Sequence, residues 1–549
     1  MMTHSLQELL VAWAAAVAGT DLPAPPAYSG PDYQLSGFCE DSREAGPETL
    51  FVARVRLSSD GHRWIGPALA NGARLVMGQQ PLAELGLELP EGATYWQVPD
   101  TAIALAWLAA AFYGFPARQL VMIGVTGSDG KTTTSSILYA ILRHAGIAAG
   151  LISTVHAAFG DQIEHLPLHV TTPEAPLVQQ YLRRLVDGGF THCVLEATSH
   201  GLDQHRVGAI HFDLAAVTNI NHEHLDYHGS WEAYFAAKAR LFQNLALPRV
   251  PNERFPFAAR KLALLPTAVL NRDDRSYEGL AAIDVPQQFS YGIESEADFQ
   301  ARGIMTLSHV TRFELAGPAG PPYPLESPLV GYFNVYNLLA AAALATALGL
   351  SPAQIQAGAA ALAQVTGRMQ RIDKGQPFLV IVDFAHTPGS LEQAIRTAAR
   401  IRAEQGRGRI ITVFGSAGKR DVAKRSLMAA ISAREADLTV LTAEDPRTES
   451  LDDILATMAA GCAGAGAVEG ESFWRIPDRG WAIWFALNMA QPDDILLICG
   501  KGHEQSMCFG ETEFPWDDLI ATETALDAYL AGQPMPDLGL PTYEPDWTI

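Results

Sequence analysis

The residues best suited to chemistry form a glycine-bracketed loop, TGSDGKTTT, at positions 126–134. Gly127 and Gly130 allow backbone N–H groups to turn inward toward an anion, as a phosphate cradle requires. Lys131 then supplies a cation for the terminal phosphates of a nucleotide, and the positive end of a following helix adds to it. The alternative is an ordinary glycine-rich turn. The order of strand, loop, Lys-Thr and helix favours the cradle, although Val125 stands where the strict pattern has its first glycine.

A second group of polar residues follows two later apolar stretches. Glu196 ends the stretch 193–196, and the histidine-rich segment 218–229 begins at the end of the stretch 214–219. A carboxylate at a strand end beside a phosphate loop can share Mg²⁺ with the Thr132 hydroxyl. Each histidine taken alone is more often a hydrogen-bonded loop residue than a ligand, and Lys238, in an alanine-rich helical stretch, is most simply a solvated surface residue.

The sequence pattern of the elements that must position these groups predicts an α/β protein. Apolar stretches of strand length, buried on both faces, alternate with alanine-rich helical stretches, which is typical of parallel sheets. We expect three domains: an α/β domain at 1–118, a central domain with the phosphate loop at 119–366, and a Rossmann-like domain at 367–549. Ligands of such sheets bind at the carboxyl ends of the strands.

Composition limits the possible partners. The formal net charge of −22 argues against binding to nucleic acid or an anionic membrane, so an anionic substrate needs local arginines, lysines and helix termini. Five scattered cysteines indicate reduced thiols. We find no stretch of transmembrane length and no basic signal region at the start, and therefore expect a cytoplasmic protein, monomeric and acting on small molecules.

Nine motifs in order resemble those of the Mur ligases, and among them the members that add a diamino acid. They are TGSDGKTTT, EATSHGLDQHRV, TNINHEHLDYHG, AAK, GYFNVYNLLAA, GRM, VDFAHTP, AEDPRTE and GKGHE. The resemblance spans residues 41–504, and HLDYHG with GLDQHRV separates this branch from its sister ligases. It implies a three-domain ligase that uses ATP and Mg²⁺ to activate UDP-N-acetylmuramoyl-L-alanyl-D-glutamate as an acyl phosphate. The amine of a diamino acid then attacks, in peptidoglycan precursor synthesis.

The resemblance also assigns roles to residues. Catalysis falls to Lys131, Glu196, His224 and Lys238, the last carrying a CO₂-derived carbamate (N6-carboxylysine). Magnesium ligands are Thr132, Glu196, His224 and carbamylated Lys238. The remaining ATP contacts are Gly127, Ser128, Asp129, Gly130, Thr133, Asn337, Arg368 and Asp383. The UDP substrate is assigned to Ser42, Thr171, Thr172, Thr198, Gln204 and Arg206, and the incoming amino acid to Arg420, Asp445, Arg447, Gly500 and Glu504.

Two departures from the family pattern affect specificity. The family's meso-diaminopimelate pattern is Asp-Asn-Pro-Arg, and here Asp445 replaces the asparagine, while Lys419 alters a neighbouring loop. Arg447 favours meso-diaminopimelate, but L-lysine and L-ornithine stay open. In the first domain Arg56 replaces a glycine, and it could contact the nucleotide sugar.

Two other hypotheses remain. The chain could be a ligase of the same superfamily acting on another substrate, resembling cyanophycin synthetase or folylpolyglutamate synthetase. It could also be a relative that binds nucleotide without catalysis. The complete set of Lys131, Glu196, His224 and Lys238 argues against the second.

Overall fold

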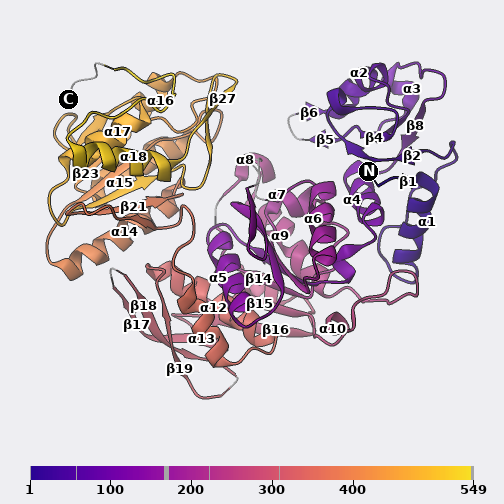
Figure 1. Cartoon of the computed structure of the whole chain (residues 1–549), viewed down its shortest axis with the longest axis horizontal. Coiled ribbons are helices and arrows are strands. Elements are labelled where there is room, and N and C mark those ends of the chain that lie inside the picture. Colours follow the sequence, from indigo (N-terminus) through magenta and orange to yellow (C-terminus); the bar gives the residue numbers. More distant parts are fainter. Residues whose placement is uncertain are drawn as a thin grey trace. The chain divides into compact units, whose positions relative to one another are not determined.

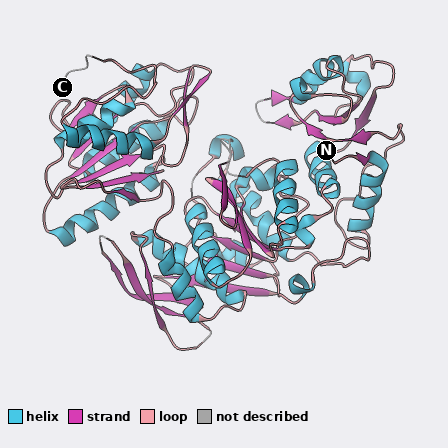
Figure 2. Cartoon of the chain, viewed as in Figure 1, coloured by secondary structure: helices cyan, strands magenta, loops and turns pink. Residues whose placement is uncertain are grey.

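The computed structural model describes residues 2–56, 59–165, 172–221, 223–307, 309–318 and 320–545, with only the backbone for residues 165, 225 and 226. The chain separates into two compact units. The first comprises Met1–Phe299 with Ala340–Ser351, and the second comprises Gln300–Leu339 with Pro352–Ile549. Both units contain helices together with strands, which Figure 2 colours cyan and magenta, so the predicted α/β class is confirmed. The three-domain boundaries at 118 and 366 remain a prediction.

The amino-terminal part of the first unit is a small parallel sheet. Its strands, in spatial order, are β3 (Gly37–Cys39), β4 (Thr49–Val52), β7 (Leu75–Gly78) and β8 (Thr94–Gln97). Helices α1 (Leu6–Val17) and α4 (Thr101–Phe112) pack together through the stacked rings of Trp13 and Trp107. Asp100 begins α4 by accepting the N–H groups of Ala102 and Ile103, as a helix cap does.

The central sheet of the first unit holds the phosphate loop. Its strands, in spatial order, are β12 (Gln162–His165), β11 (His156–Phe159), β10 (Ala149–Ile152), β13 (His192–Glu196), β9 (Val121–Thr126), β14 (Leu214–Val217), β15 (Thr267–Asn271) and β16 (Gln287–Gly292). The strands from β10 to β16 run parallel. Their carboxyl ends therefore meet at one edge of the sheet. Helices α5 (Lys131–His144), α6 (Ala175–Asp187), α7 (Ser199–Asp203) and α9 (Trp231–Leu245) connect them (Figure 1).

The second unit contains two sets of strands. One is the antiparallel series β17 (Phe299–Thr306), β18 (Thr311–Ala316) and β19 (Tyr323–Ser327). Helices α12 (Tyr332–Ala347) and α13 (Pro352–Ala361) follow it. The other is a sheet in the order β20 (Gln370–Ile372), β21 (Leu379–Asp383), β25 (Ile495–Cys499), β22 (Ile410–Phe414), β23 (Leu438–Leu441) and β24 (Phe473–Arg475).

The sheet that ends the chain has the expected Rossmann-like character. All its strands except β20 are parallel, and apolar residues from both faces are buried beneath helices. The sequence predicts strands at 378–383, 409–414, 438–442 and 494–499, and these match β21, β22, β23 and β25 to within one residue at their ends. The longest helices here are α14 (Pro388–Gln405), α15 (Ala423–Glu435), α16 (Leu451–Gly464), α17 (Arg479–Met489) and α18 (Asp518–Ala531).

Other expectations can be compared with the described residues. All five cysteines are free thiols, and only Cys508 is partly exposed. In the described part of the chain no helix has both the length and the apolar character needed to cross a bilayer. The proline- and arginine-rich segment 246–262 contains one short helix, α10 (Ala259–Leu262).

Candidate active site

The phosphate loop, residues 127–131, runs from the end of β9 into α5. Gly127 has φ +149°, and a Cβ placed there would lie 1.8 Å from the Thr218 Oγ1. Only glycine fits so close to that side chain. The Asn219 main-chain oxygen accepts the Ser128 N–H at 2.7 Å, and its side-chain oxygen accepts the Asp129 N–H at 3.0 Å. The chain just after β14 therefore fixes the shape of the loop.

Lys131 lies at the first position of α5. Its Nζ donates to the main-chain oxygens of Gly127 at 3.0 Å and Ser128 at 2.5 Å. The ammonium is thus held inside the curve of the loop, where it can neutralise an anion bound to the same backbone. Gly130 has φ +82°, which lets the chain turn directly into the helix, and Thr133 is buried in its first turn.

Thr132 and Glu196 meet as the sequence predicts. The Thr132 Oγ1 donates to the Glu196 Oε2 at 3.1 Å, from the start of α5 to the end of β13. Glu196 is fully buried. A residue that the sequence reasoning missed, Thr154, also donates to this carboxylate, through its hydroxyl at 2.8 Å and its N–H at 3.3 Å. Thr154 follows β10, the neighbour of β13, so the strand-end rule could have found it.

Lys238 is not a surface residue. It is 1% exposed and its Nζ donates to the Gly127 main-chain oxygen at 2.7 Å, so it shares that acceptor with Lys131. Burial, and then the nearby Lys131 charge, hold the pKa of Lys238 well below its usual value. Tyr234, one helical turn earlier, covers the ammonium at 4.5 Å from its ring centre and exchanges a hydrogen bond with Ser128 at 2.9 Å.

His224 lies on the other side of Tyr234. The ring centres of His224 and Tyr234 are 6.1 Å apart, and those of His224 and His200 are 4.8 Å apart. His224 has φ +55°, a left-handed conformation that is uncommon outside glycine, and its side chain is 43% exposed. The His224 side chain therefore lies at the surface beside Tyr234, whereas the Lys238 side chain lies in the core.

Oxygen donors for Mg²⁺ are present, and they fit that ion. Mg²⁺ is usually held by one or two carboxylates with hydroxyls, waters and substrate phosphates rather than by a closed protein cage. The Thr132 hydroxyl and the Glu196 carboxylate are such a partial set. Across the described residues no cluster of three or more His, Cys, Asp or Glu side chains is arranged to hold a metal by itself.

Four of the residues assigned to the UDP substrate lie together. Thr172 Oγ1 donates to the Glu196 main-chain oxygen at 2.9 Å and lies 3.1 Å from the Thr198 hydroxyl, which caps α7. Arg206 donates to the Thr172 main-chain oxygen at 2.7 Å and to the Gln204 side chain at 2.8 Å. Thr171 lies outside the described residues. Ser42 is buried in the amino-terminal part of the unit, at the start of a short 3₁₀ turn (Ser42–Glu44).

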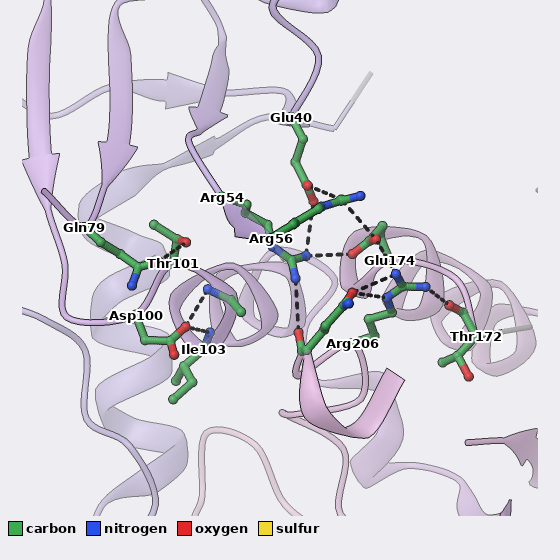
Figure 3. Close-up of polar contacts among 12 residues, drawn as sticks. Glu40, Arg54, Arg56, Gln79, Asp100, Thr101, Ile103, Thr172, Glu174 and Arg206 are labelled. Carbon is green, nitrogen blue, oxygen red and sulfur yellow. Dashed lines mark hydrogen bonds and ion pairs between the residues drawn. The ribbon is translucent and has the colours of Figure 1, made fainter. Parts of the chain in front are cut away.

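Two arginines that precede this group join it to the amino-terminal sheet. Figure 3 shows Arg54 and Arg56 reaching Glu40 and Glu174, with Arg206 on the far side of Glu174. Arg56 therefore forms ion pairs, at 2.5 Å to Glu40 and 3.2 Å to Glu174, in place of the glycine of the family pattern. Three guanidiniums face two carboxylates, which leaves one positive charge in excess.

A cavity of about 430 Å³ opens beside this network. Its apolar wall is formed in part by alanines of α9, and its polar wall is formed by Arg56, Asp203, Gln204, Tyr227, His228 and Arg240. This volume is within the range of small-molecule sites. Arg56 and Gln204 thus face both the ion-pair network and an open space.

The remaining ATP residues belong to the second unit. Asn337 is buried within α12, where its side-chain N–H donates to the Asn334 side-chain oxygen at 2.9 Å. Arg368 lies over the Phe384 ring at 4.5 Å. Asp383 ends β21 and accepts the N–H groups of Met369 and Ala385 at 2.6 and 2.8 Å. That these residues and Lys131 meet around one nucleotide remains a prediction.

Carboxylates gather around Lys501 at the carboxyl ends of β23 and β25. The Lys501 Nζ, fully buried, pairs with Asp445 at 3.0 Å and with Glu504 at 2.5 Å. Glu444 lies next to Gly500, whose φ is +114°, and burial raises the pKa of its carboxyl, with opposing effects of Lys424 and Lys501. Sequence reasoning missed Lys501 and Glu444, although both stand in the quoted motifs.

Arg447 and Arg420 are the two predicted cations of this region. Arg447 has φ +54°, and its backbone is held by hydrogen bonds to Cys508 at 2.9 Å and Gly510 at 2.7 Å. Arg420 is exposed in the loop after β22. In the described residues neither side chain has a carboxylate partner, so both guanidiniums can receive an anion. Asp445, by contrast, already forms an ion pair with Lys501 and accepts a hydrogen bond from the Cys508 N–H at 3.0 Å.

Comparison with known proteins agrees with this arrangement. Residues 125–345 match the Mur ligase middle domain, and residues 367–502 match the Mur ligase glutamate ligase domain. A curated UDP-N-acetylmuramyl-tripeptide synthetase of Roseiflexus sp. (strain RS-1) is 40% identical over 91% of this chain and 96% of its own length. The chain belongs to the Mur ligase family.

Two further similarities fall in the same branch of the family. A UDP-N-acetylmuramoyl-L-alanyl-D-glutamate–2,6-diaminopimelate ligase of Geobacillus kaustophilus (strain HTA426) is 38% identical over 88% of this chain and 94% of its own. A solved structure of a ligase with that same name superimposes with a TM-score of 0.60 at 29% identity, covering 90% of this chain and 95% of the other. The predicted family and fold are therefore confirmed for this Mur ligase.

Proposed function

We propose that this Mur ligase forms an amide between UDP-N-acetylmuramoyl-L-alanyl-D-glutamate and a diamino acid, with consumption of ATP and release of ADP and phosphate. The observation that carries the proposal is the convergence of Lys131, Lys238 and the Thr132–Glu196 pair at one edge of the central sheet. This convergence occurs in a chain 40% identical to a tripeptide synthetase. We infer a monomer that acts in the cytoplasm, where ATP and the UDP-linked precursor are available.

The chemistry requires cations near the reacting carboxylate. A carboxylate and a nucleotide triphosphate repel each other, and charge develops on the transferred phosphoryl group. Lys131 supplies a fixed positive charge on the loop, and the N–H groups at the start of α5 point the same way. Mg²⁺, held by Thr132 and Glu196, would neutralise phosphate charge. The product of this step is an acyl phosphate, which the amine of the second substrate attacks.

Lys238 is suited to carbamylation. Only a neutral amine reacts with CO₂, and burial lowers the pKa of Lys238 well below its usual value. Its Nζ lies against the loop that would hold the phosphates. The carbamate would convert this buried cation into an oxygen ligand facing His224, and so complete a second metal position.

The UDP substrate carries two phosphate charges in a protein of net charge −22. The hydroxyls of Thr172 and Thr198 and the guanidinium of Arg206 are grouped beside Glu196, and the ion-pair network around them keeps one excess positive charge. Ser42, in the amino-terminal sheet, is the proposed contact for the uracil end. These positions are the ones that the family motifs assign.

The proposed amino-acid site offers both carboxylates and guanidiniums to the charged groups of a diamino acid. The cluster of Glu444, Asp445 and Glu504 around Lys501 suits an ammonium, while Arg447 and Arg420 each offer an unpaired guanidinium to a carboxylate. Because Lys501 already neutralises Asp445, this residue opposes a distal carboxylate less than its charge suggests. We therefore favour meso-diaminopimelate over L-lysine and L-ornithine.

A substrate panel tests the proposal. Phosphate release is measured with ATP, Mg²⁺ and the UDP-muramoyl-dipeptide, and with each of the three amino acids in turn. We expect turnover only in the complete mixture, fastest with meso-diaminopimelate, and none with the folded variant Lys131→Ala. Phosphate release that needs no UDP-linked substrate, or no release with any of the three amino acids, would contradict it.

A further inference from the structure

A second cavity lies in the first unit, away from the residues described so far. Its volume is about 540 Å³. Three segments line it: the turn before β9 around Gln119, the turn before β13 around Thr191, and residues 254–260, which include the start of α10. The last of these lies in the segment 246–262, which contains the short helix α10.

This cavity is at the opposite edge of the central sheet from the phosphate loop. Val121 and His192 are register partners and begin β9 and β13, directly after the lining residues Gln119 and Thr191. The loop and Glu196 lie at the other ends of these strands. Six residues of extended strand span about 20 Å, so one small molecule cannot occupy both places.

The lining of the cavity is strongly cationic. Arg118, Arg254 and Arg260 contribute to it, and no Asp or Glu does. None of the three forms an ion pair with a described residue. A single exposed arginine is ordinarily just solvated, and two of these three are exposed. Three arginines around one cavity indicate an anion site more strongly, because carboxylates that could pair with them are abundant elsewhere in a chain of net charge −22.

One of the arginines holds the cavity in shape. Arg118 is buried and donates to the main-chain oxygens of Phe255 at 2.7 Å and Ala16 at 2.5 Å. Burial lowers its pKa to about 10, so it stays charged at neutral pH. Arg254 and Arg260 are then left to face a ligand. Among the described residues, the Arg260 guanidinium donates one long hydrogen bond, at 3.5 Å to the Gln119 main-chain oxygen.

The remaining walls are flat and apolar. Phe115, Phe190, Phe255 and Phe257 line the cavity. Phe115 and Phe255 pack with ring centres 4.8 Å apart, and Phe257 lies 4.5 Å beneath the Arg118 guanidinium. A cavity of this volume with apolar walls and a few convergent polar groups is the usual form of a small-molecule site.

We propose that this cavity binds an anionic small molecule, whose carboxylate or phosphate pairs with Arg254 and Arg260 and whose flat apolar body packs against the phenylalanines. The inference does not depend on the ligase activity. A carboxylate and a phosphate are recognised in the same way, since a guanidinium can donate two parallel hydrogen bonds to either group.

Binding is tested with four probes of similar size: phenyl phosphate, benzoate, benzyl alcohol and benzylamine. Ligand-observed NMR on the full-length protein gives each Kd, with an ATP analogue and the UDP-muramoyl-dipeptide present at saturation so that the proposed active site is filled. The double variant Arg254→Gln/Arg260→Gln removes the exposed cations. Arg74→Gln/Arg302→Gln, at exposed positions that also lack a carboxylate partner, changes the net charge equally.

We expect phenyl phosphate or benzoate to bind more tightly than about 1 mM, and at least tenfold more tightly than the neutral alcohol or the amine. The Arg254/Arg260 variant should weaken the anions about tenfold or more, and the control variant should not. The relative affinities of the two anions identify the favoured head group. Equal binding of all four probes, equal effects of both double variants, or no anion binding at 1 mM to a protein with unchanged Tm would overturn the proposal.

Discussion

Replacement of Arg447 by alanine tests how this ligase selects its amino acid. The main chain at this position is held by hydrogen bonds to Cys508 and Gly510, and those bonds do not involve the side chain. Alanine and arginine tolerate the left-handed φ of +54° about equally, since both carry a Cβ. The guanidinium has no ion pair to a described residue, so its removal leaves no buried carboxylate unpaired. The change therefore acts on substrate binding rather than on folding.

The size of the effect follows from the partial burial of the side chain. Truncation of one partner of a buried, hydrogen-bonded charge pair costs about 2–5 kcal/mol. Arg447 is only partly buried, so the lower end applies. A loss of about 2 kcal/mol lowers kcat/KM for meso-diaminopimelate about 30-fold. L-Lysine and L-ornithine have no distal carboxylate, and they should lose less than about threefold by the same conversion.

The assay is kcat/KM for the three amino acids with wild type and three variants. Arg420→Ala is the matched control, because a guanidinium that binds the carboxylate common to all three substrates should lower all three values alike. Asp445→Asn should shift preference toward meso-diaminopimelate, since an asparagine oxygen can still accept the Cys508 N–H without the negative charge. Equal losses for all three substrates in Arg447→Ala would refute the specificity argument.

Three other changes have definite expected outcomes. Lys238→Ala should reduce kcat by a factor of about 10²–10³, which is the usual effect of losing one electrostatic group at a reacting centre. Formate or acetate should restore part of the lost activity. Full activity without these additives would exclude a catalytic role for Lys238. Gly367→Ala should lower the free energy of unfolding by about 2–4 kcal/mol, because the added Cβ would lie 2.5 Å from backbone atoms. The control Gly375→Ala, at φ +93° with open space around it, should lower this free energy by about 1 kcal/mol. Chemical denaturation of the two variants and the wild type measures both values. Burial, and then the Lys261 charge, lowers the pKa of His211 to about 4. The unfolded chain therefore binds a proton there at higher pH than the folded one, and stability should fall by about 3 kcal/mol as pH drops from 6.5 to 4; a variant His211→Gln with the same acid loss would disprove this origin.

The strands and the phosphate loop could be predicted because their signals are local. The stretch before Gly127 is apolar on both faces, and the loop needs glycine at defined positions, so both are visible in a short window of sequence. The pairing of Thr132 with Glu196 also followed, since the loop that leads to Thr132 follows the carboxyl end of β9 and Glu196 ends the neighbouring strand β13.

The burial of Lys238 could not be read from its own helix. The alanines beside it pack equally well on a surface or in a core, and only the loop from β9, more than a hundred residues earlier, decides which. The same holds for Arg56, whose partners Glu40 and Glu174 are far apart in the sequence. The sugar contact expected for Arg56 was inferred without Glu174, because nothing in the sequence near Arg56 indicates a partner 118 residues away. Long-range ion pairs carry no periodic signal.

The central claim is that the D-glutamyl carboxylate of the UDP-linked substrate is activated by phosphoryl transfer before the amide forms. The most direct measurement uses this substrate labelled with ¹⁸O in that carboxylate, with ATP, Mg²⁺ and meso-diaminopimelate, and follows the product and the phosphate by mass spectrometry. Our account predicts a tripeptide product and one ¹⁸O atom transferred to inorganic phosphate in each turnover. Product formation with unlabelled phosphate, or label found in AMP, would contradict it.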